Sequence, residues 1–322
     1  MLARGEAGPV LARGEAGPVL ARSAIALRSS PAIALCSSPA IGLRSSAEAL
    51  GSSIVAIIRK TPEEIEKIAA SGRILTRCHR LLRGKARPGV TTGELDEAAE
   101  RFIRSQGAEP VFLGYRGFTG SICASPNSMV VHGIPGDYAL GRGDVLSIDI
   151  GVKFDGWVSD AAVTLPIGSV AEVARELLAS TRASLFDAVE QCRPGNRLGD
   201  VSSAVQRRVE ADGFSVIRSL VGHGVGRDMH EDPQIPNVGK PGTGPVLEEG
   251  MVLAVEPMVN AGAHEVRLGE DGWAVYSLDG SLAAHFEHTV AVTAQGPRIL
   301  TPWHEQDAPQ RTAASPPAGA RA

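Results

Sequence analysis

Two aspartates, Asp149 and Asp160, lie in a stretch whose alternating residues predict a β-hairpin. Residues 143–165 read GDVLSIDIGVKFDGWVSDAAVTL, and the turn at residues 153–156 ends in an Asp-Gly pair that tolerates positive φ. If the loop has an even number of residues, both carboxylates point to one face, directly opposite or diagonally paired. Neighbouring carboxylates repel each other and are expensive to bury, which favours a divalent cation between them. Two acids on a solvated outer face are the alternative.

The sequence around Asp149 has a counterpart further along the chain. Gly143–Asp149 recurs as Gly250–Glu256, 107 residues on, and Arg87–Gly89 recurs as Arg193–Gly195, 106 residues on. An amphipathic helix is predicted after each Arg-Pro-Gly. Offsets that agree to within one residue favour a duplicated half-domain of two helices and sheet over coincidence of helical and strand patterns.

This repeat puts Glu256 where Asp149 lies in the first half. Residues 282–292 (LAAHFEHTVAV) are predicted to form the last strand of a second, longer hairpin, in which Glu287 takes the place of Asp160. Two hairpins related by a two-fold axis would bring four carboxylates to that axis. Their combined charge is too large for one divalent ion, and two such ions would neutralise it.

His223 is the best candidate for a nitrogen ligand beside these acids. It lies in the segment GHGVG at residues 222–226, where glycines let the backbone come close to a ligand. Oxygen ligands with an imidazole favour first-row divalent ions such as Mn, Fe, Co or Zn. A paired metal site can lower the pKa of a bound water and produce hydroxide at neutral pH.

Two other histidines lie in turn-rich sequence rather than on a regular apolar face. They are His132 in VHGIP and His230 in MHEDP. A lone histidine is more often a structural group than a catalyst, so these residues alone leave both roles open. The structural interpretation also holds for the remaining histidines, which are His79, His264, His285, His288 and His304.

Three helices are predicted to position these strands. Thr61–Glu64 is a capping box with proline at the first helical position, and its helix is expected to stop at Arg87–Gly89. Thr91–Glu94 opens a second helix that ends at Gly107. Residues 198–211 form the third, which ends before a glycine.

Composition excludes several classes of function. The chain has 322 residues and a net charge of −4, which gives no basic surface for nucleic acid. It contains no apolar run long enough to span a bilayer. The cysteines show no CxxC spacing, so reduced thiols in a cytoplasmic protein are expected rather than a disulfide framework or a zinc knuckle.

The two ends of the chain differ from the middle. LARGEAGPV occurs at residues 2–10 and again at 11–19, and repeats of this kind cannot bury a core. Residues 1–52 are therefore expected to be a disordered low-complexity extension, with a transit peptide or a misassigned start codon as alternatives. The folded domain is expected to cover residues 53–301. The Pro- and Ala-rich tail at 302–322 is expected to be disordered.

Several segments together resemble the signature sequences of type I, bacterial-type methionine aminopeptidases. They are DIGVKFDGWVSDAAVTLPIG, GHGVGRDMHEDPQIPN, MVLAVEPMVN and DGWAVYSLDGSLAAHFEHTVAV. The resemblance covers about residues 61–301, with the ligand-bearing motifs in the family's order and spacing. It implies the α+β pita-bread (creatinase/aminopeptidase-like) fold, a pseudo-two-fold antiparallel sheet covered by helices.

The resemblance also implies a role for each acid and for His223. Asp149 and Asp160 would be metal ligands from the first hairpin, with Asp160 bridging both ions. His223 would bind one ion through its imidazole. Glu256 would be a ligand that also handles protons during amide hydrolysis, and Glu287 would be the second bridging carboxylate.

The loop histidines and an apolar pocket follow from the same resemblance. His132 would contact the substrate near the scissile amide nitrogen. His230 would hydrogen-bond the scissile carbonyl and stabilise the tetrahedral intermediate. Five side chains match positions that line the family's methionine pocket, with core packing as the alternative for all of them: Tyr115, Phe118, Cys123, Met229 and Trp273. Met229 replaces a common Phe, and the Asp after His230-Glu231 replaces a common Glu, which leaves fine specificity open.

The implied reaction is removal of the initiator methionine from nascent polypeptides, with two divalent ions and a small second residue preferred. We expect a cytoplasmic monomer that acts on N-termini beginning with Met, and we leave the ribosome open as a partner. Neither nucleic acid nor membrane is expected to bind. The alternatives are a proline-directed peptidase of the same fold, a metal-free pita-bread binding module, and a metal-binding structural or storage protein.

Overall fold

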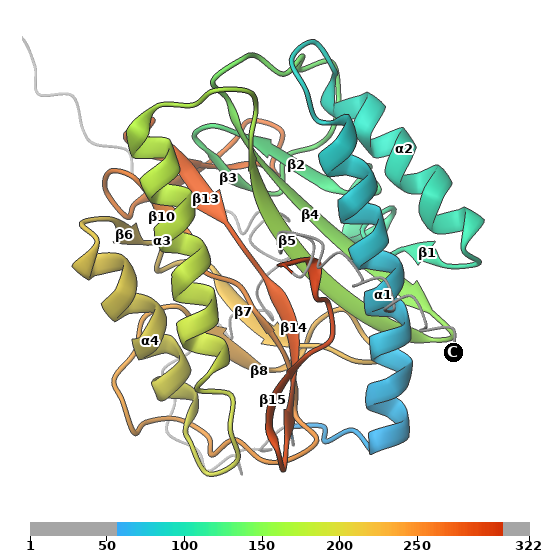
Figure 1. The fold of residues 1–322 in the computed structure, drawn as a ribbon, viewed down its shortest axis with the longest axis vertical. Helices are drawn as coiled ribbons and strands as arrows, with labels where there is room; N and C mark the ends of the chain where they lie inside the picture. Colours follow the sequence, from blue (N-terminus) through green and yellow to red (C-terminus); the bar gives the residue numbers. More distant parts are fainter. Residues whose placement is uncertain (1–56, 305–322) are drawn as a thin grey trace, which may run out of the picture.

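Four α-helices and a series of antiparallel strands build the part of the chain that the computed structural model describes, residues 57–304 (Figure 1). The helices are α1 (Pro62–Lys85), α2 (Thr92–Ser105), α3 (Glu172–Val189) and α4 (Leu198–Ala211). None of these four has the length and hydrophobicity that a bilayer-spanning helix requires. Helices and antiparallel sheet thus share the described chain, as the predicted α+β class requires.

The predicted capping boxes start α1 and α2. The Thr61 hydroxyl accepts a hydrogen bond from the Glu64 backbone N–H, and the Glu64 carboxylate accepts one from the Thr61 N–H. Thr91 and Glu94 exchange the same two bonds at α2. Each pair satisfies backbone donors that a helix start leaves free, so both predicted starts are confirmed. The bounds of α4 match the predicted residues 198–211.

The first hairpin is a continuous ladder of two ten-residue strands, β4 (Val145–Phe154) and β5 (Trp157–Pro166). Its turn consists of Asp155 and Gly156 alone, both at positive φ (50° and 77°), so β4 extends further into the predicted turn. Asp149 lies opposite Ala162, and Asp160 lies opposite Gly151. The two aspartates are therefore diagonal neighbours on one face, which confirms the predicted geometry.

The other strands extend this ladder and form further antiparallel sheets. β4 also pairs with β1 (Glu109–Pro110) and β2 (Cys123–Pro126). A five-stranded sheet has the order β15 (Gly296–Ile299), β14 (His288–Thr293), β9 (Val252–Val255), β7 (Val221–Gly224) and β8 (Glu231–Pro236). One three-stranded sheet has the order β13 (Ala283–His285), β10 (Met258–Asn260) and β6 (Ser215–Val216). A second has the order β11 (Val266–Leu268), β12 (Val275–Ser277) and β3 (Met129–Val131).

The two halves of the described chain repeat one backbone plan. Gly89 and Gly195 both have φ of 90° after their Arg-Pro pairs. An isolated antiparallel bridge joins Thr91 to Ala139 in the first half and Arg197 to Val246 in the second. In Figure 1, α1 and α2 lie over one half of the strands and α3 and α4 over the other. The predicted internal repeat is therefore present in the backbone.

The second hairpin differs from the prediction that residues 282–292 form one strand. This segment is divided into β13 and β14, which belong to different sheets, and Glu287 lies between them. The opposite segment divides in the same way, because Glu256 and Pro257 separate β9 from β10. Proline has no N–H for a ladder, which gives a physical reason for the break at that point.

Packing continues beyond the predicted domain boundary at residue 301. The Trp303 side chain is 1% exposed, and its indole N–H donates to the Glu287 carbonyl over 2.8 Å. The indole also stacks on His288, with ring centroids 4.4 Å apart. The folded domain therefore includes residues 302–304. The rest of the predicted tail, and the predicted extension at 1–52, lie outside the described residues.

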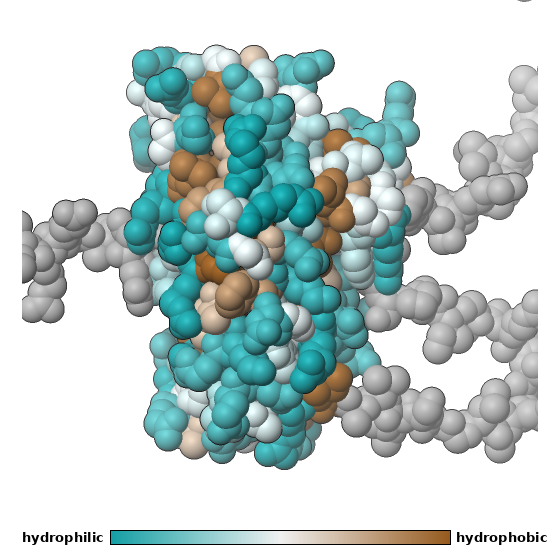
Figure 2. Space-filling model, turned by 90° about the vertical axis from the view of Figure 1, so that its right-hand side faces the viewer, coloured by the Kyte–Doolittle hydropathy of each residue, from teal (hydrophilic) through white to brown (hydrophobic). Residues whose placement is uncertain are grey.

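Apolar side chains from both halves share one large core. Leu75 of α1, Ile148 of β4, Leu185 of α3 and Leu253 of β9 are fully buried within it. A second apolar cluster, which includes Phe118, lies beside the four acids and is described below. On the face shown in Figure 2, hydrophobic residues form small groups among hydrophilic ones, as is usual for a face in contact with water.

Candidate metal centre

The four predicted carboxylates and His223 line one small cavity. Asp149 comes from β4 and Asp160 from β5, whereas Glu256 follows β9 and Glu287 precedes β14. His223 lies on β7, and all five side chains are buried. The cavity has a volume of about 10 Å³. The structure thus brings together residues up to 138 positions apart, as the two-fold argument predicted.

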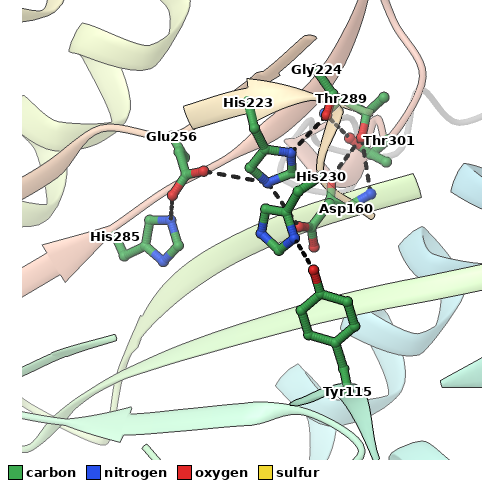
Figure 3. Close-up of polar contacts among 9 residues, drawn as sticks. All are labelled: Tyr115, Asp160, His223, Gly224, His230, Glu256, His285, Thr289 and Thr301. Carbon is green, nitrogen blue, oxygen red and sulfur yellow. Dashed lines mark hydrogen bonds and ion pairs between the residues drawn. The ribbon is translucent and has the colours of Figure 1, made fainter. Parts of the chain in front are cut away.

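The His223 imidazole is oriented as a metal ligand would be. Its Nδ1 lies 2.9 Å from the Gly224 carbonyl oxygen, which can only accept, so Nδ1 carries the proton. Its Nε2 lies 3.7 Å from an Asp160 oxygen and 3.6 Å from a Glu256 oxygen (Figure 3). Burial lowers the His223 pKa to about 4, so the ring is neutral at pH 7 and its Nε2 lone pair faces the acids.

Several carboxylate oxygens in the cavity have no hydrogen-bond partner within residues 57–304. They are Oδ1 of Asp149, Oδ1 of Asp160 and Oε1 of Glu287. Buried polar atoms are almost always paired, so unpaired carboxylate oxygens that face one cavity fit a bound cation. Ligand atoms of Asp160, His223 and Glu287 also lie within 4.8 Å of one another. These residues therefore fit a metal ion.

Without a cation, burial opposes ionisation of the acids. It raises the pKa of Asp149 to about 7, although a hydrogen bond with Asp160 acts in the opposite direction. Burial also raises the pKa of Asp160 well above its ordinary value, and the charges of Glu287 and Asp149 add to it. Glu256 and Glu287 are raised in the same way, first by burial and then by neighbouring carboxylates. Divalent ions would stabilise the charged forms of all four.

Polar contacts from outside the first hairpin fix the backbone around these acids. The Thr289 hydroxyl donates to the Asp160 carbonyl over 2.8 Å and accepts from the Asp160 N–H over 3.0 Å, which joins β5 to β14. The Asn237 amide donates to the Glu256 carbonyl over 2.9 Å. Neither residue was predicted, because such contacts depend on tertiary neighbours that a local pattern does not contain.

The two loop histidines, His132 and His230, also line the cavity. His230 Nδ1 lies 2.9 Å from the Tyr115 hydroxyl, and its ring centroid lies 4.3 Å from that of His223. Burial, together with the charges of its neighbours, lowers the His230 pKa to about 2. His132 is buried and has φ of 59°, a left-handed conformation that is uncommon outside glycine and often marks functional sites.

The predicted pocket residues form the apolar wall of the cavity and the layer behind it. Cys123 and Met229 line the cavity directly. Phe118 and Trp273 belong to the same apolar cluster and pack edge to face, with centroids 5.2 Å apart. Tyr115 is half-buried, and its hydroxyl contacts His230. The five therefore lie together, although Tyr115 also orients a histidine.

Two further residues belong to the site and were missed from the sequence. Phe112 lines the cavity, and a Cβ on Gly151 would lie 2.9 Å from its ring, so glycine lets this ring reach the first hairpin. His285, which we expected to be structural, has its Nε2 3.7 Å from a Glu256 oxygen (Figure 3). Its position two residues before Glu287 in a predicted strand was the available signal, because alternate residues share a face.

Comparison with known proteins agrees with this site. The model of metallopeptidase family M24 matches residues 66–294. The chain belongs to this family. M24 proteins similar to it include methionine aminopeptidase 1 of Bacillus subtilis (strain 168), which is 51% identical over 245 residues, or 76% of this chain and 99% of that protein. Methionine aminopeptidase 1 of Mycobacterium tuberculosis (strain CDC 1551 / Oshkosh) is 45% identical over 250 residues, covering 76% of this chain and 94% of that protein. These matches place the chain among the M24 methionine aminopeptidases.

Solved M24 structures confirm the pita-bread fold. A methionine aminopeptidase from Thermotoga maritima superposes with a TM-score of 0.75 at 45% identity, covering 76% of this chain and 99% of that one. A prolidase from Pyrococcus horikoshii OT3 shares the fold at a TM-score of 0.63 and 23% identity. The match covers 76% of this chain but only 63% of the prolidase. Among M24 proteins, the chain therefore matches methionine aminopeptidases over nearly their whole length.

Proposed function

We propose that this M24 protein removes methionine from the N-terminus of polypeptides by hydrolysing the first peptide bond. The observation that carries the proposal is one cavity in which four carboxylates and His223 meet two histidines and an apolar wall. Acids and an imidazole suit divalent metal, and the wall suits a thioether side chain. Similarity to methionine aminopeptidases at 45–51% identity supports the same substrate class.

Five residues would hold two divalent ions. Asp149 and Asp160 would contribute from the first half of the fold, and His223, Glu256 and Glu287 from the second. When bound, the ions supply Lewis acidity toward the scissile carbonyl and a nucleophile at neutral pH. The mixed oxygen and nitrogen donors favour Mn, Fe, Co or Zn.

The loop histidines would act on the two sides of the scissile bond. If the Tyr115 O–H donates to His230 Nδ1, the single proton of the neutral ring lies on Nε2. This N–H can then stabilise negative charge that develops on the carbonyl oxygen. His132 would contact the amide nitrogen, and Glu256 would carry a proton toward the leaving amine.

The apolar wall would bind the methionine side chain. Cys123 and Met229 face the cavity, with Phe118 and Trp273 behind them. Polarisable sulfur and aromatic edges make favourable contacts with a thioether. A small second residue would be preferred because the scissile bond must lie against the metal centre, which leaves little room for a larger side chain.

We also propose that the substrates are newly made chains, which the enzyme meets as a monomer in the cytoplasm. The reaction itself supports this setting, since a chain carries its initiator methionine from the start of its synthesis. The three cysteines within residues 57–304 are unpaired, buried thiols, as expected in a reducing compartment.

Peptide hydrolysis by the purified full chain tests the proposed function. We expect methionine to be released from Met-Ala-Ser in the presence of Mn or Co, and much less from Met-Leu-Ser. A proline-directed peptidase would instead cleave an Ala-Pro dipeptide and spare Met-Ala-Ser. A binding module would cleave none of the three. Either outcome would contradict the proposal.

A further inference from the structure

A buried ion pair lies outside the metal centre. The Lys60 ammonium is 2.6 Å from a Glu231 oxygen, and the two side chains are 2% and 5% exposed. The neighbouring pair, Arg59 with Glu248, is 2.7 Å long but has side chains that are 55% and 51% exposed. Taking two charges out of water is costly, and their attraction offsets this cost only when the geometry of the pair is close to ideal. An exposed pair stays hydrated and has no such requirement. Lys60 and Glu231 are therefore held in one arrangement.

Glu231 closes the loop that carries two residues of the site. One of its carboxylate oxygens accepts hydrogen bonds from the backbone N–H groups of Arg227 (2.8 Å) and Asp228 (3.3 Å). The loop between them and Glu231 contains Met229 and His230, which line the cavity. The other oxygen of Glu231 accepts the Lys60 ammonium, so one carboxylate both closes the loop and ties it to the start of the domain.

Lys60 is itself fixed just before α1. Its backbone N–H donates to the Gly250 carbonyl over 2.7 Å, and its ammonium also donates to the Ile58 carbonyl over 3.2 Å. The pair packs tightly against Gly226, because a Cβ there would lie 2.6 Å from Lys60 Cε and 2.7 Å from Glu231 Oε1. The ammonium is therefore a rigid anchor and not a mobile surface charge.

We propose that the Lys60–Glu231 pair positions His230 and Met229 against the metal centre. Two contacts then hold the loop: Tyr115 bonds the His230 ring, and Lys60 bonds Glu231, the next residue. Lys60 is not among the residues that line the cavity, so it is a positioning residue. Small displacements of a group that acts on the transition state lower the rate strongly. The inference rests on the proposed aminopeptidase function.

Four variants separate positioning from simple stabilisation. Lys60→Met breaks the pair, and Glu231→Gln keeps an oxygen for the two backbone donors. The double variant Lys60→Met/Glu231→Gln removes both charges, so no unpaired charge is left buried. Arg59→Met is the matched control, since it breaks an exposed pair at the adjacent residue.

We expect Lys60→Met to lower kcat on Met-Ala-Ser by about tenfold or more with a smaller change in KM. The double variant should recover most of the melting temperature and little of the kcat. In a His230→Ala background, Lys60→Met should cause a much smaller loss, because most of its effect on kcat acts through His230. Amides 226–231 should exchange hydrogen faster in the single and double variants. Arg59→Met should match the unmodified chain in every measurement.

Three results would overturn the inference. They are unchanged kcat in the double variant, a full additional loss in the His230→Ala background, and unchanged exchange at amides 226–231 after Lys60→Met. The exchange measurement requires no turnover. If the unmodified chain released no methionine, the proposed function would fail, and the exchange data would still decide whether Lys60 holds the loop.

Discussion

The two halves of the fold hold their acids in different ways. In the first half, Asp149 and Asp160 lie inside an unbroken ladder between two ten-residue strands. In the second, Glu256 and Glu287 lie at breaks, where β9 and β14 belong to one sheet and β10 and β13 to another. The first pair is thus placed by strand register, with Thr289 bonded to the Asp160 backbone, whereas the second pair lies outside any ladder and depends on contacts from other elements.

That support is visible around the two glutamates. The Asn237 side chain donates to the Glu256 carbonyl, and the Trp303 indole donates to the Glu287 carbonyl. The Glu287 N–H donates to Ala162, opposite Asp149 in the first hairpin, over 2.9 Å. Equivalent acids of a repeated fold can therefore lie on a continuous hairpin in one half and at breaks between two sheets in the other.

The largest expected effect treats both halves alike. Asp149→Ala and Glu256→Ala should each abolish methionine release, because each would remove a ligand from a site whose acids act together. The fold should survive, since both side chains lie in a cavity and not in the apolar core. Release of methionine from Met-Ala-Ser and the far-UV circular dichroism of each variant provide the check. Turnover retained by one metal-loaded variant would show that its half is dispensable.

The support of Glu287 should cost stability when it is removed. Trp303→Ala loses a buried indole and its hydrogen bond to Glu287, so we expect a loss of about 3–5 kcal/mol. Chemical denaturation measures it. Chains that end at residue 301 and at residue 304 are the matched pair. Only the shorter should be destabilised, and equal stability would support a domain boundary at residue 301.

The metal-free protein should become less stable as pH rises. Burial raises the pKa of Asp149 from its ordinary 3.8 to about 7, so its stabilising contribution is full below pH 4 and is lost as pH rises toward 7. Melting temperatures in chelator at pH 5 and pH 8 measure this loss. Asp149→Asn should flatten the dependence by a few degrees, at about 2–4 °C per kcal/mol for a domain of this size. An equally steep profile in Asp149→Asn would show that the acid is not responsible.

The smallest expected effects compare one turn from each half. Gly156 and Gly280 each follow an aspartate, and both glycines have positive φ (77° and 75°). Neither has other atoms within 4 Å of the position that a Cβ would take. Gly156→Ala and Gly280→Ala should each cost about 1 kcal/mol through left-handed strain, with kcat unchanged. Denaturation and peptide hydrolysis check both. If kcat fell for Gly156→Ala but not for Gly280→Ala, strain in the turn of the first hairpin would be shown to displace the acids that this hairpin carries.

Local patterns were enough to predict the first half of the site. Alternation and the Asp-Gly turn predicted the hairpin, and the capping boxes predicted the starts of α1 and α2, because these signals act over a few residues. The constant offset between the halves then located Glu256 and Glu287. The family resemblance added roles for His132 and His230.

The remaining features depend on contacts between distant residues. The break at Glu287 requires a neighbouring sheet, and the burial of Trp303 requires the core it enters. Lys60 and Glu231 are 171 residues apart, so no local pattern relates them. Sequence identified the residues that carry charge, whereas the structure was needed to show what holds them in place.

Metal-dependent methionine release tests the central claim most directly. The full chain is stripped with chelator, and its hydrolysis of Met-Ala-Ser is followed as Mn or Co is returned. We predict no release from the stripped protein, restored release as metal is added, and none at any metal concentration for the double variant Asp149→Ala/Glu256→Ala. Release that persists after metal is removed, or that the double variant recovers with metal, would contradict the account.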